Sequence, residues 1–189
     1  MPGQARPIPQ DFHSVTPYLT LNDAARALDF YKRAFGAKEV MRMDAPNGKI
    51  GHAEIKIGDS IVMLADEMPS TGVRSPQSLG GTTCGVFLYV DNVDAVFNQA
   101  VSAGAHVEAA VADMFWGDRY GRLKDPFGHS WSVATHKEDV APAEMSKRMQ
   151  QAAAKMGRQT QSAHYPVGQA VLPVFSPGGG YSFTSGSST

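Results

Sequence analysis

The stretch WGDRYGRLKDPFGHSW, residues 116–131, decides the fold of this chain. Runs that alternate in polarity lie on either side of Asp-Pro-Phe-Gly at 125–128, a sequence typical of a tight turn. Alternation with a period of two is the pattern of a β-strand. The stretch therefore predicts a hairpin of two strands, 119–124 and 130–135.

The residues before this hairpin extend it into a larger unit. A strand is predicted at 85–90 and another near 107–111, with a helix between them. Asp91 or Asn92 caps the helix, and Gly104 ends it, because glycine accepts the left-handed conformation of a helix C-terminus. The apolar positions line one face of the helix: Val93, Val96, Phe97 and Ala100.

The first half of the chain shows the same order. Strand 15–21 precedes a helix that Asn22 or Asp23 caps and Gly36 ends. Its apolar positions again share a face: Ala24, Ala27, Leu28, Tyr31 and Phe35. Three strands follow, at 38–43, 49–57 and 60–65. Turn and helix-ending glycines recur at nearly the same spacing in both halves, which indicates two copies of one βαβββ module.

These patterns predict one α+β domain at 14–140, with modules at about 14–66 and 84–136. A flexible arm, 1–13, precedes the domain. A helix with a methionine stripe is expected at 141–156, and we expect the stripe to pack against another surface. Residues 157–189 are rich in Gly, Ser and Pro, a composition typical of a flexible tail.

The composition excludes several classes of function. The net charge is −1 and no basic stripe is present, so we expect no nucleic-acid partner. The single cysteine, Cys84, cannot form an intramolecular disulfide. No apolar run is long enough for a signal peptide or a bilayer span. We therefore expect a cytoplasmic protein without a membrane partner.

Several motifs resemble the vicinal oxygen chelate superfamily, which includes glyoxalase I, bleomycin-resistance proteins and extradiol dioxygenases, and above all its PhnB-like branch. The longest is WGDRYG at 116–121 with DPFGHSW at 125–131; PYL at 17–19 and GHAEI at 51–55 are shorter. The resemblance covers about residues 14–157. It implies two modules whose sheets curl into a cleft-bearing incomplete barrel. It also implies a homodimer, because superfamily cavities commonly form between modules of partner chains.

Strand alternation assigns the two faces of each predicted sheet. The aliphatic face is expected under the helix, and the mixed face is expected to line the cavity. This assignment predicts residues that bind an unidentified small molecule: Tyr18, Thr20, Phe87, Tyr89, Tyr120, Arg122 and Ser132. Trp116, in the loop before strand 119–124, is a further ligand-binding candidate as a lip of the pocket, or else a dimer contact. Arg122 is expected to meet either Glu54 or an anionic ligand, since an unpaired buried guanidinium is costly.

The resemblance also implies a divalent metal held by His, Gln or Glu on the first and last strands of each module. The aligned positions are Thr16, Val62, Gly85 and Ser132, and none is a nitrogen or carboxylate donor. We therefore expect no cofactor and a small-molecule-binding protein of the bleomycin-resistance type.

His52 and Glu54 leave a second interpretation open. They alternate on strand 49–57 and are predicted to face inward. They could serve as an acid–base pair, as two donors of a displaced divalent metal site, or as a hydrogen-bonded pair without chemistry. The first two readings predict a lyase or isomerase of the same superfamily. A third hypothesis is a partner-binding domain, which the unusual composition of the tail would indicate.

Overall fold

The computed structural model describes residues 5–162, and its first unit ends at Ala152, with a second unit beginning at Ala153. The first unit holds both predicted modules. Helix α4 (Pro142–Ser162) starts in the first unit and runs beyond the expected end at 156, so the expected tail begins as helix. The rest of that tail, from 163, lies outside the described residues, as do residues 1–4 of the expected arm. No helix of the described residues is long and apolar enough to cross a membrane.

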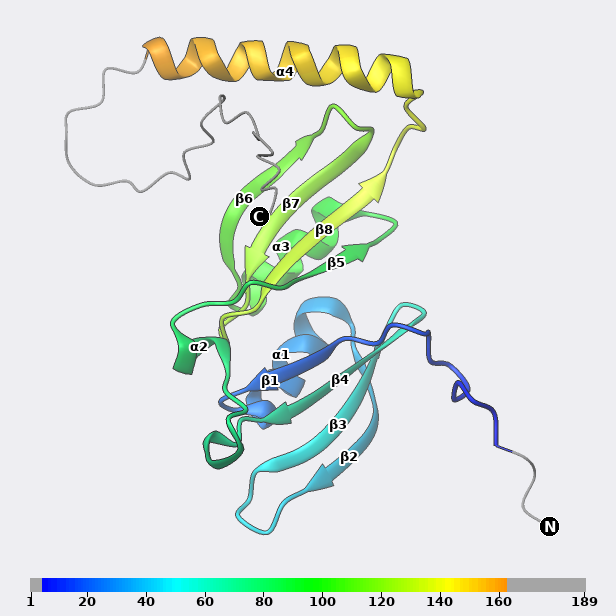
Figure 1. Cartoon of the computed structure of the whole chain (residues 1–189), viewed down its shortest axis with the longest axis vertical. Coiled ribbons are helices and arrows are strands. Elements are labelled where there is room, and N and C mark those ends of the chain that lie inside the picture. The colour runs from blue at the N-terminus through cyan, green and yellow to red at the C-terminus, as the bar shows by residue number, and fades with distance from the viewer. Residues whose placement is uncertain (1–4, 163–189) are drawn as a thin grey trace, which may run out of the picture. The chain divides into compact units, whose positions relative to one another are not determined.

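Each half of the first unit is a βαβββ module, as predicted (Figure 1). The first module consists of β1 (Tyr18–Leu21), α1 (Ala24–Phe35), β2 (Lys38–Asp44), β3 (Ile50–Ile57) and β4 (Ser60–Asp66). The second consists of β5 (Gly85–Tyr89), α3 (Val93–Ala103), β6 (His106–Asp113), β7 (Asp118–Lys124) and β8 (Ser130–His136). The sheet orders are β1-β4-β3-β2 and β5-β8-β7-β6, so the first strand of each module is an edge strand.

The helix ends follow the sequence signals. Asp23 accepts a hydrogen bond from the Arg26 backbone at 3.1 Å, and Asn92 accepts one from Ala95 at 3.1 Å, so these residues are the caps. Gly36 ends α1 in the left-handed conformation, with φ of 65°. Strand β1 starts at Tyr18 rather than at 15, directly after Pro17, which has no N–H to give to a sheet.

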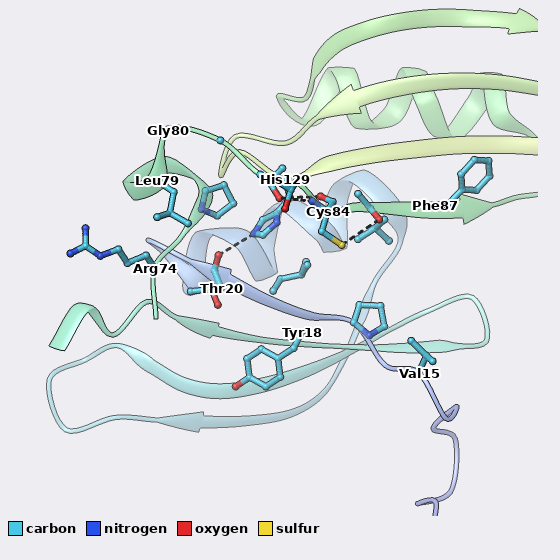
Figure 2. A pocket seen from close by; sticks show the side chains of 17 residues that line it. Val15, Tyr18, Thr20, Arg74, Leu79, Gly80, Cys84, Phe87 and His129 are labelled. Atoms are coloured by element: carbon cyan, nitrogen blue, oxygen red, sulfur yellow. Dashed lines mark hydrogen bonds between the residues drawn. The ribbon is translucent and has the colours of Figure 1, made fainter. Parts of the chain in front are cut away.

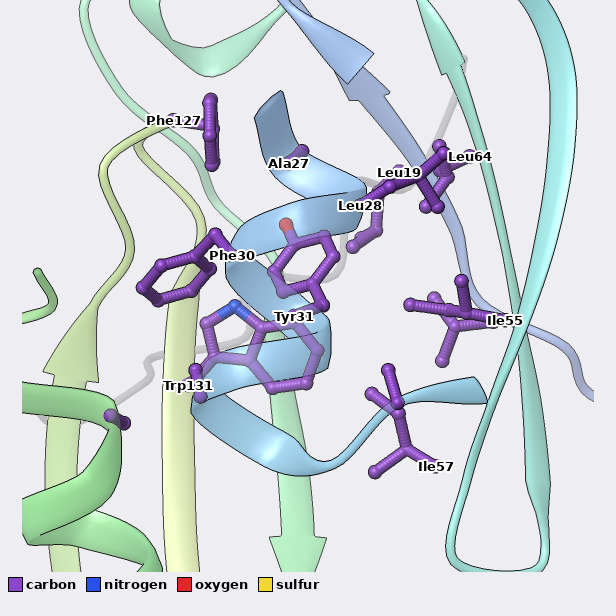
Figure 3. Close-up of a cluster of buried hydrophobic side chains, with 14 of the residues drawn as sticks. Leu19, Ala27, Leu28, Phe30, Tyr31, Ile55, Ile57, Leu64, Phe127 and Trp131 are labelled. Carbon is purple, nitrogen blue, oxygen red and sulfur yellow. The ribbon is translucent and has the colours of Figure 1, made fainter. Parts of the chain in front are cut away.

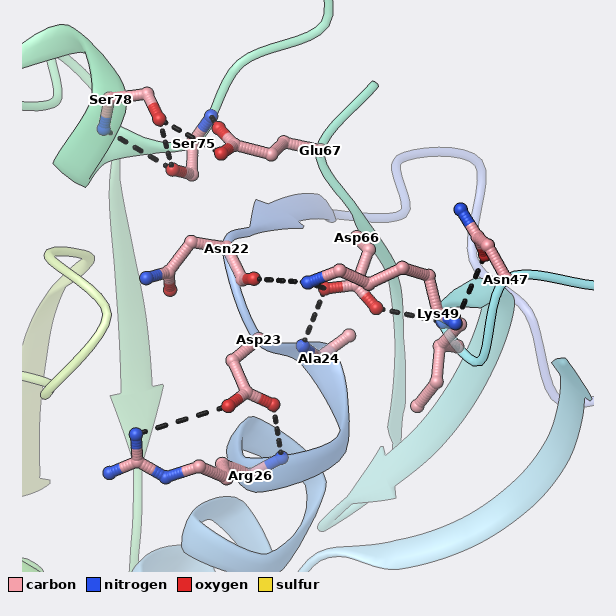
Figure 4. Close-up of polar contacts among 11 residues, drawn as sticks. Asn22, Asp23, Ala24, Arg26, Asn47, Lys49, Asp66, Glu67, Ser75 and Ser78 are labelled. Atoms are coloured by element: carbon pink, nitrogen blue, oxygen red, sulfur yellow. Dashed lines mark hydrogen bonds and ion pairs between the residues drawn. The ribbon is translucent and has the colours of Figure 1, made fainter. Parts of the chain in front are cut away.

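The linker between the modules contains structure that the sequence did not indicate. It holds a 3-10 turn (Pro69–Thr71) and a short helix, α2 (Pro76–Leu79). Glu67 accepts hydrogen bonds from the Ser75 backbone at 2.8 Å and from the Ser78 hydroxyl at 2.9 Å (Figure 4). These bonds, led by the one from the Ser75 backbone, lower the pKa of Glu67. The linker is thus tied to the end of β4.

The core forms where the helices cover the aliphatic faces of the sheets (Figure 3). Leu19, Ile55 and Leu64 are buried beneath α1, which confirms the predicted faces of β1 and β3. Helices α1 and α3 also pack on each other. Trp131 of β8 joins the modules, because its ring lies 4.5 Å from Phe35 and 5.3 Å from Tyr31, between centroids.

Asp125 is the polar centre of this junction. Its carboxylate is 4% exposed and accepts four hydrogen bonds. The Tyr31 hydroxyl donates at 2.7 Å and the Trp131 indole at 3.0 Å, while the backbone N–H groups of Phe127 and His129 each donate at 2.9 Å. Burial, and then the neighbouring carboxylate, raise the pKa of Tyr31 well above its ordinary value. One carboxylate thus links α1 of the first module to the turn before β8.

Candidate ligand-binding site

A cavity of about 880 Å³ lies between strands β1 and β5 and the linker (Figure 2). Its walls come from residues 15–20, from linker residues between Arg74 and Cys84, from the start of β5, and from His129. Most of these side chains are apolar or carry hydroxyl groups. The volume lies in the range of about 300–1,000 Å³ that is usual for pockets that bind small molecules.

The cavity includes three of the predicted ligand-binding residues. Tyr18, Thr20 and Phe87 line it. The other predicted residues lie outside the cavity lining. Trp116 is in the turn before β7, and the rest lie on the sheet faces that point away from the helices: His52, Glu54, Tyr89, Tyr120, Arg122 and Ser132.

His129 and the linker residues are cavity residues that sequence reasoning did not select. His129 is 8% exposed, and its Nε2 lies 3.0 Å from the backbone oxygen of Thr20. A carbonyl oxygen only accepts, so Nε2 carries the hydrogen. The His129 backbone N–H donates to Asp125 at 2.9 Å and so stabilises the turn before β8. Its side chain also bridges the two modules, to a residue that no local pattern could identify.

Four aromatic rings form a continuous group on the open face of the second sheet, here called the aromatic face: Phe87, Tyr89, Trp116 and Tyr120. Ring centroids are 4.9 Å apart for Phe87 and Tyr89, 5.9 Å for Phe87 and Tyr120, and 5.8 Å for Trp116 and Tyr120. Phe87 is 49% exposed and Tyr89 is 59% exposed. Phe87 belongs both to this face and to the cavity, so the two features are contiguous.

Asp118 fixes two rings of the aromatic face through hydrogen bonds. Its carboxylate, 4% exposed, accepts from the Tyr89 hydroxyl at 3.1 Å and from the Trp116 indole at 3.0 Å. The His136 Nδ1–H donates to its other oxygen at 2.8 Å. Burial, and then the bond to Asp118, raise the pKa of Tyr89. The orientation of two rings therefore depends on one buried acid.

His136 is expected to titrate above its ordinary pKa of 6.5. The hydrogen bond to Asp118, and then the one to Asp139 at 3.0 Å, raise the pKa because both carboxylates favour the imidazolium. A raised folded-state pKa means that the contribution of His136 to stability is complete below the pKa of the unfolded chain. It is lost as the pH rises through the folded-state pKa. An NMR titration of the imidazole checks this, and Asp139→Asn should lower the midpoint; a wild-type midpoint at or below 6.5 would contradict it.

The first sheet carries a chain of three polar side chains on its open face. The Tyr18 hydroxyl lies 3.1 Å from His52 Nδ1, and His52 Nε2 lies 3.4 Å from a Glu54 carboxylate oxygen. Because a carboxylate only accepts, Nε2–H donates to Glu54, and Nδ1 accepts from Tyr18. Ala53 and Ile55 are buried on the opposite face, so His52 and Glu54 lie on the face away from the helix, as predicted, but they do not line the cavity.

Of the two partners expected for Arg122, Glu54 or an anionic ligand, the first is wrong. Arg122 forms an ion pair with Glu108 at 3.1 Å, and its side chain is 51% exposed. Glu108 also pairs with Lys124 at 3.3 Å. The charge of the Arg122 guanidinium is therefore paired within the second module, by Glu108 of β6. Ser132 lies across from Arg122 and bonds to the Tyr120 hydroxyl at 3.1 Å.

The positions aligned with the superfamily's metal ligands do not fit a divalent metal. Val62 is buried in the core, so counting along the strand placed this ligand position on the wrong face. Its neighbour Met63, paired with both Tyr18 and Glu54, belongs to the open face but offers only a thioether. Gly85 has no side chain, and the Thr16 hydroxyl bonds to the His13 backbone. Among the described residues, no group of three or more His, Cys, Asp or Glu is placed to hold a metal.

The two modules and their open faces define a class of protein. Residues 12–133 match the Glyoxalase/Bleomycin resistance protein/Dioxygenase superfamily, and the chain belongs to this family. It is 45% identical over 139 residues to the Uncharacterized protein Rv0887c of Mycobacterium tuberculosis, covering 72% of this chain and 82% of that protein.

Solved structures support the same assignment. TioX from Micromonospora is 32% identical, with a TM-score of 0.54 over 66% of this chain and 98% of TioX. The PhnB protein of Bacillus cereus shares the fold at 17% identity, with a TM-score of 0.52 over 65% of this chain and 99% of that one. The expected family and its PhnB-like fold are thereby confirmed.

Proposed function

We propose that this protein binds a small organic molecule without the metal ligands of its enzymatic relatives. The observation that carries the proposal is the aromatic face, which adjoins a cavity of about 880 Å³ through Phe87. Exposed, ordered rings offer large contact area to a planar or apolar compound at little entropic cost. The residues at the aligned metal positions support the same reading, since they are poor ligands.

Ligand recovery from a metabolite extract tests this function. The protein is incubated with the extract and purified again, and retained compounds are identified by mass spectrometry. The wild type should retain a compound at near-stoichiometric amounts, and Tyr89→Ala should lose most of it. Val101→Ala, an exposed position on α3, is the matched control and should retain the wild-type amount. Equal retention by the wild type and Tyr89→Ala would contradict the proposal.

A lyase or isomerase remains the second candidate, and the Tyr18–His52–Glu54 chain favours it. A carboxylate that orients an imidazole is an arrangement suited to proton abstraction. Such an enzyme would exchange a substrate proton with solvent. The extract is therefore incubated in deuterated water with wild type and with His52→Gln. Deuterium incorporation that only the wild type supports would favour the enzyme; no difference would favour the binding protein.

We also propose a homodimer in the cytoplasm. Large apolar side chains are exposed on edge strand β2 and on α4, including Met43 and Met149, and a second copy would cover them. A single free cysteine suits a reducing compartment. Light scattering at micromolar concentration measures the assembly, and a monomeric mass would rule the dimer out.

A further inference from the structure

The cavity lies beside the free edges of both sheets. Strands β1 and β5 end their sheets, and each pairs with only one neighbour. On β1, the carbonyls of Pro17 and Leu21 accept from β4 and its end. Backbone groups alternate in direction along a strand, so those of Tyr18 and Thr20 point to the free edge. His129, which bonds to the Thr20 carbonyl, already occupies one of them.

Strand β5 presents the more complete edge. The Val90 N–H donates to the Ala134 carbonyl of β8 at 2.8 Å. By the same alternation, Val86 and Leu88 face β8, and the N–H and C=O groups of Gly85 and Phe87 point to the free edge. There the Cys84 thiol, a weak donor, lies 3.9 Å from the Gly85 carbonyl oxygen. Gly85 and Phe87 both line the cavity. The main-chain donors and acceptors of these two residues therefore border the cavity together with the side chains.

The two edges of each sheet differ in chemistry: the inner edge, β1 or β5, borders the cavity, and the outer edge, β2 or β6, lies at the opposite side of the sheet. The outer strands β2 and β6, KEVMRMD and HVEAAVAD, contain charged residues and pair with register shifts. Charges and bulges are the usual protection of an exposed edge against pairing. The inner strands β1 and β5, YLTL and GVFLY, contain no charge and pair without a shift. The protection is thus absent from the two edges that border the cavity.

The other walls suit an extended ligand with one charged end. Leu79 and Pro76 of the linker supply apolar surface. Arg74 is the one lining residue with a permanent charge, and no salt bridge or side-chain hydrogen bond joins it to the described residues. Figure 2 shows Arg74 at one end of the labelled residues, with Val15 and Phe87 at the other. A ligand laid along β5 would reach from Phe87 towards this guanidinium.

We propose that the cavity takes an extended, peptide-like ligand whose amide groups pair with the free edge of β5 at Gly85 and Phe87. Its apolar side groups contact the linker, and an acidic group at one end meets Arg74. Main-chain pairing would supply affinity, and the pockets for alternate side groups would supply selectivity. This inference rests on the proposed small-molecule binding and names the ligand class.

A pool of acetylated tetrapeptide amides tests the ligand class. The first three positions carry Val, Leu, Thr or Phe, and the fourth carries Glu. Binding to the full chain is followed by two-dimensional amide NMR. The signals of Gly85 and Phe87 should shift and saturate. A matched pool with N-methylated amides has the same side groups but cannot donate to the strand edge, so it should bind at least tenfold more weakly.

Charge exchange tests the Arg74 end separately. A third pool with Lys in place of Glu should bind more weakly to the wild type, and Arg74→Glu should reverse the preference. Equal binding of the methylated and unmethylated pools would overturn the inference, as would the absence of any shift at Gly85 and Phe87. Shifts confined to Tyr120 and Ser132 would also overturn it, while leaving the proposed function of the aromatic face intact.

Discussion

Replacing Asp125 with alanine is expected to lower the free energy of unfolding by about 3–5 kcal/mol, because each buried donor left without a partner costs about 1–3 kcal/mol. The carboxylate accepts four hydrogen bonds, and all four donors lie at the junction of the two modules. Without the carboxylate, the Tyr31 hydroxyl and the Trp131 indole would have no acceptor in apolar surroundings. Urea unfolding, followed by circular dichroism, measures the change.

Two variants separate this effect from a general loss of negative charge. Asp139→Ala removes a fully exposed acid and should change the free energy of unfolding by less than about 0.5 kcal/mol. Asp125→Asn keeps one acceptor oxygen, so its stability should fall between those of the wild type and Asp125→Ala. If Asp125→Ala lost less than about 1 kcal/mol, Asp125 would not be the polar centre of the junction.

Replacing Asp118 with alanine is expected to abolish most ligand retention, the second large effect. The Tyr89 hydroxyl and the Trp116 indole would lose their shared acceptor, and the two rings would lose their fixed orientation. Rings that must be ordered on binding cost about 0.5–1.5 kcal/mol each. Together with altered geometry, this should reduce affinity for the compound recovered from the extract by at least tenfold. Isothermal titration with that compound measures the change.

Stability must be followed in the same experiment, because Asp118 is buried. Asp118→Ala is expected to destabilise by about 2–3 kcal/mol, as its three donors lose a partner. Circular dichroism establishes that the variant is folded at the titration temperature. His136→Gln serves as control: it removes one of the three bonds but leaves both rings bonded to Asp118, and should bind nearly as the wild type. A folded Asp118→Ala variant with unchanged affinity would contradict the role of the aromatic face.

Local patterns in the sequence were sufficient to predict the two modules. Alternation placed Leu19 and Ile55 in the core and His52 on the open face, and the glycines at 36 and 104 marked the helix ends. These features depend on neighbours within a few residues. The four residues of the aromatic face were also predicted as ligand-binding candidates, Phe87, Tyr89 and Tyr120 by strand alternation and Trp116 by its position in the loop before β7.

Contacts between distant residues were not predictable in this way. His129 bonds to Thr20, 109 residues earlier in the chain, and nothing in periodicity indicates that pair. One of the two partners expected for Arg122, Glu54, lies in the other module, whereas the observed partner is Glu108 on the adjacent strand. The side of Val62 was missed because an error of one residue along a strand moves a side chain to the opposite face. Helix α2 has only four residues, too few for a helical period.

The effect of divalent metal on thermal stability tests the central claim most directly. A metal at a hundred times its dissociation constant would add about 2.7 kcal/mol to the stability of the folded chain. We predict that zinc, nickel and manganese leave the melting temperature of the wild type and of His52→Ala nearly unchanged. A rise in the wild type that disappears in His52→Ala would reveal a displaced metal site on the first sheet. A rise in both would show that residues other than His52 hold a metal, and either result would contradict metal-independent binding.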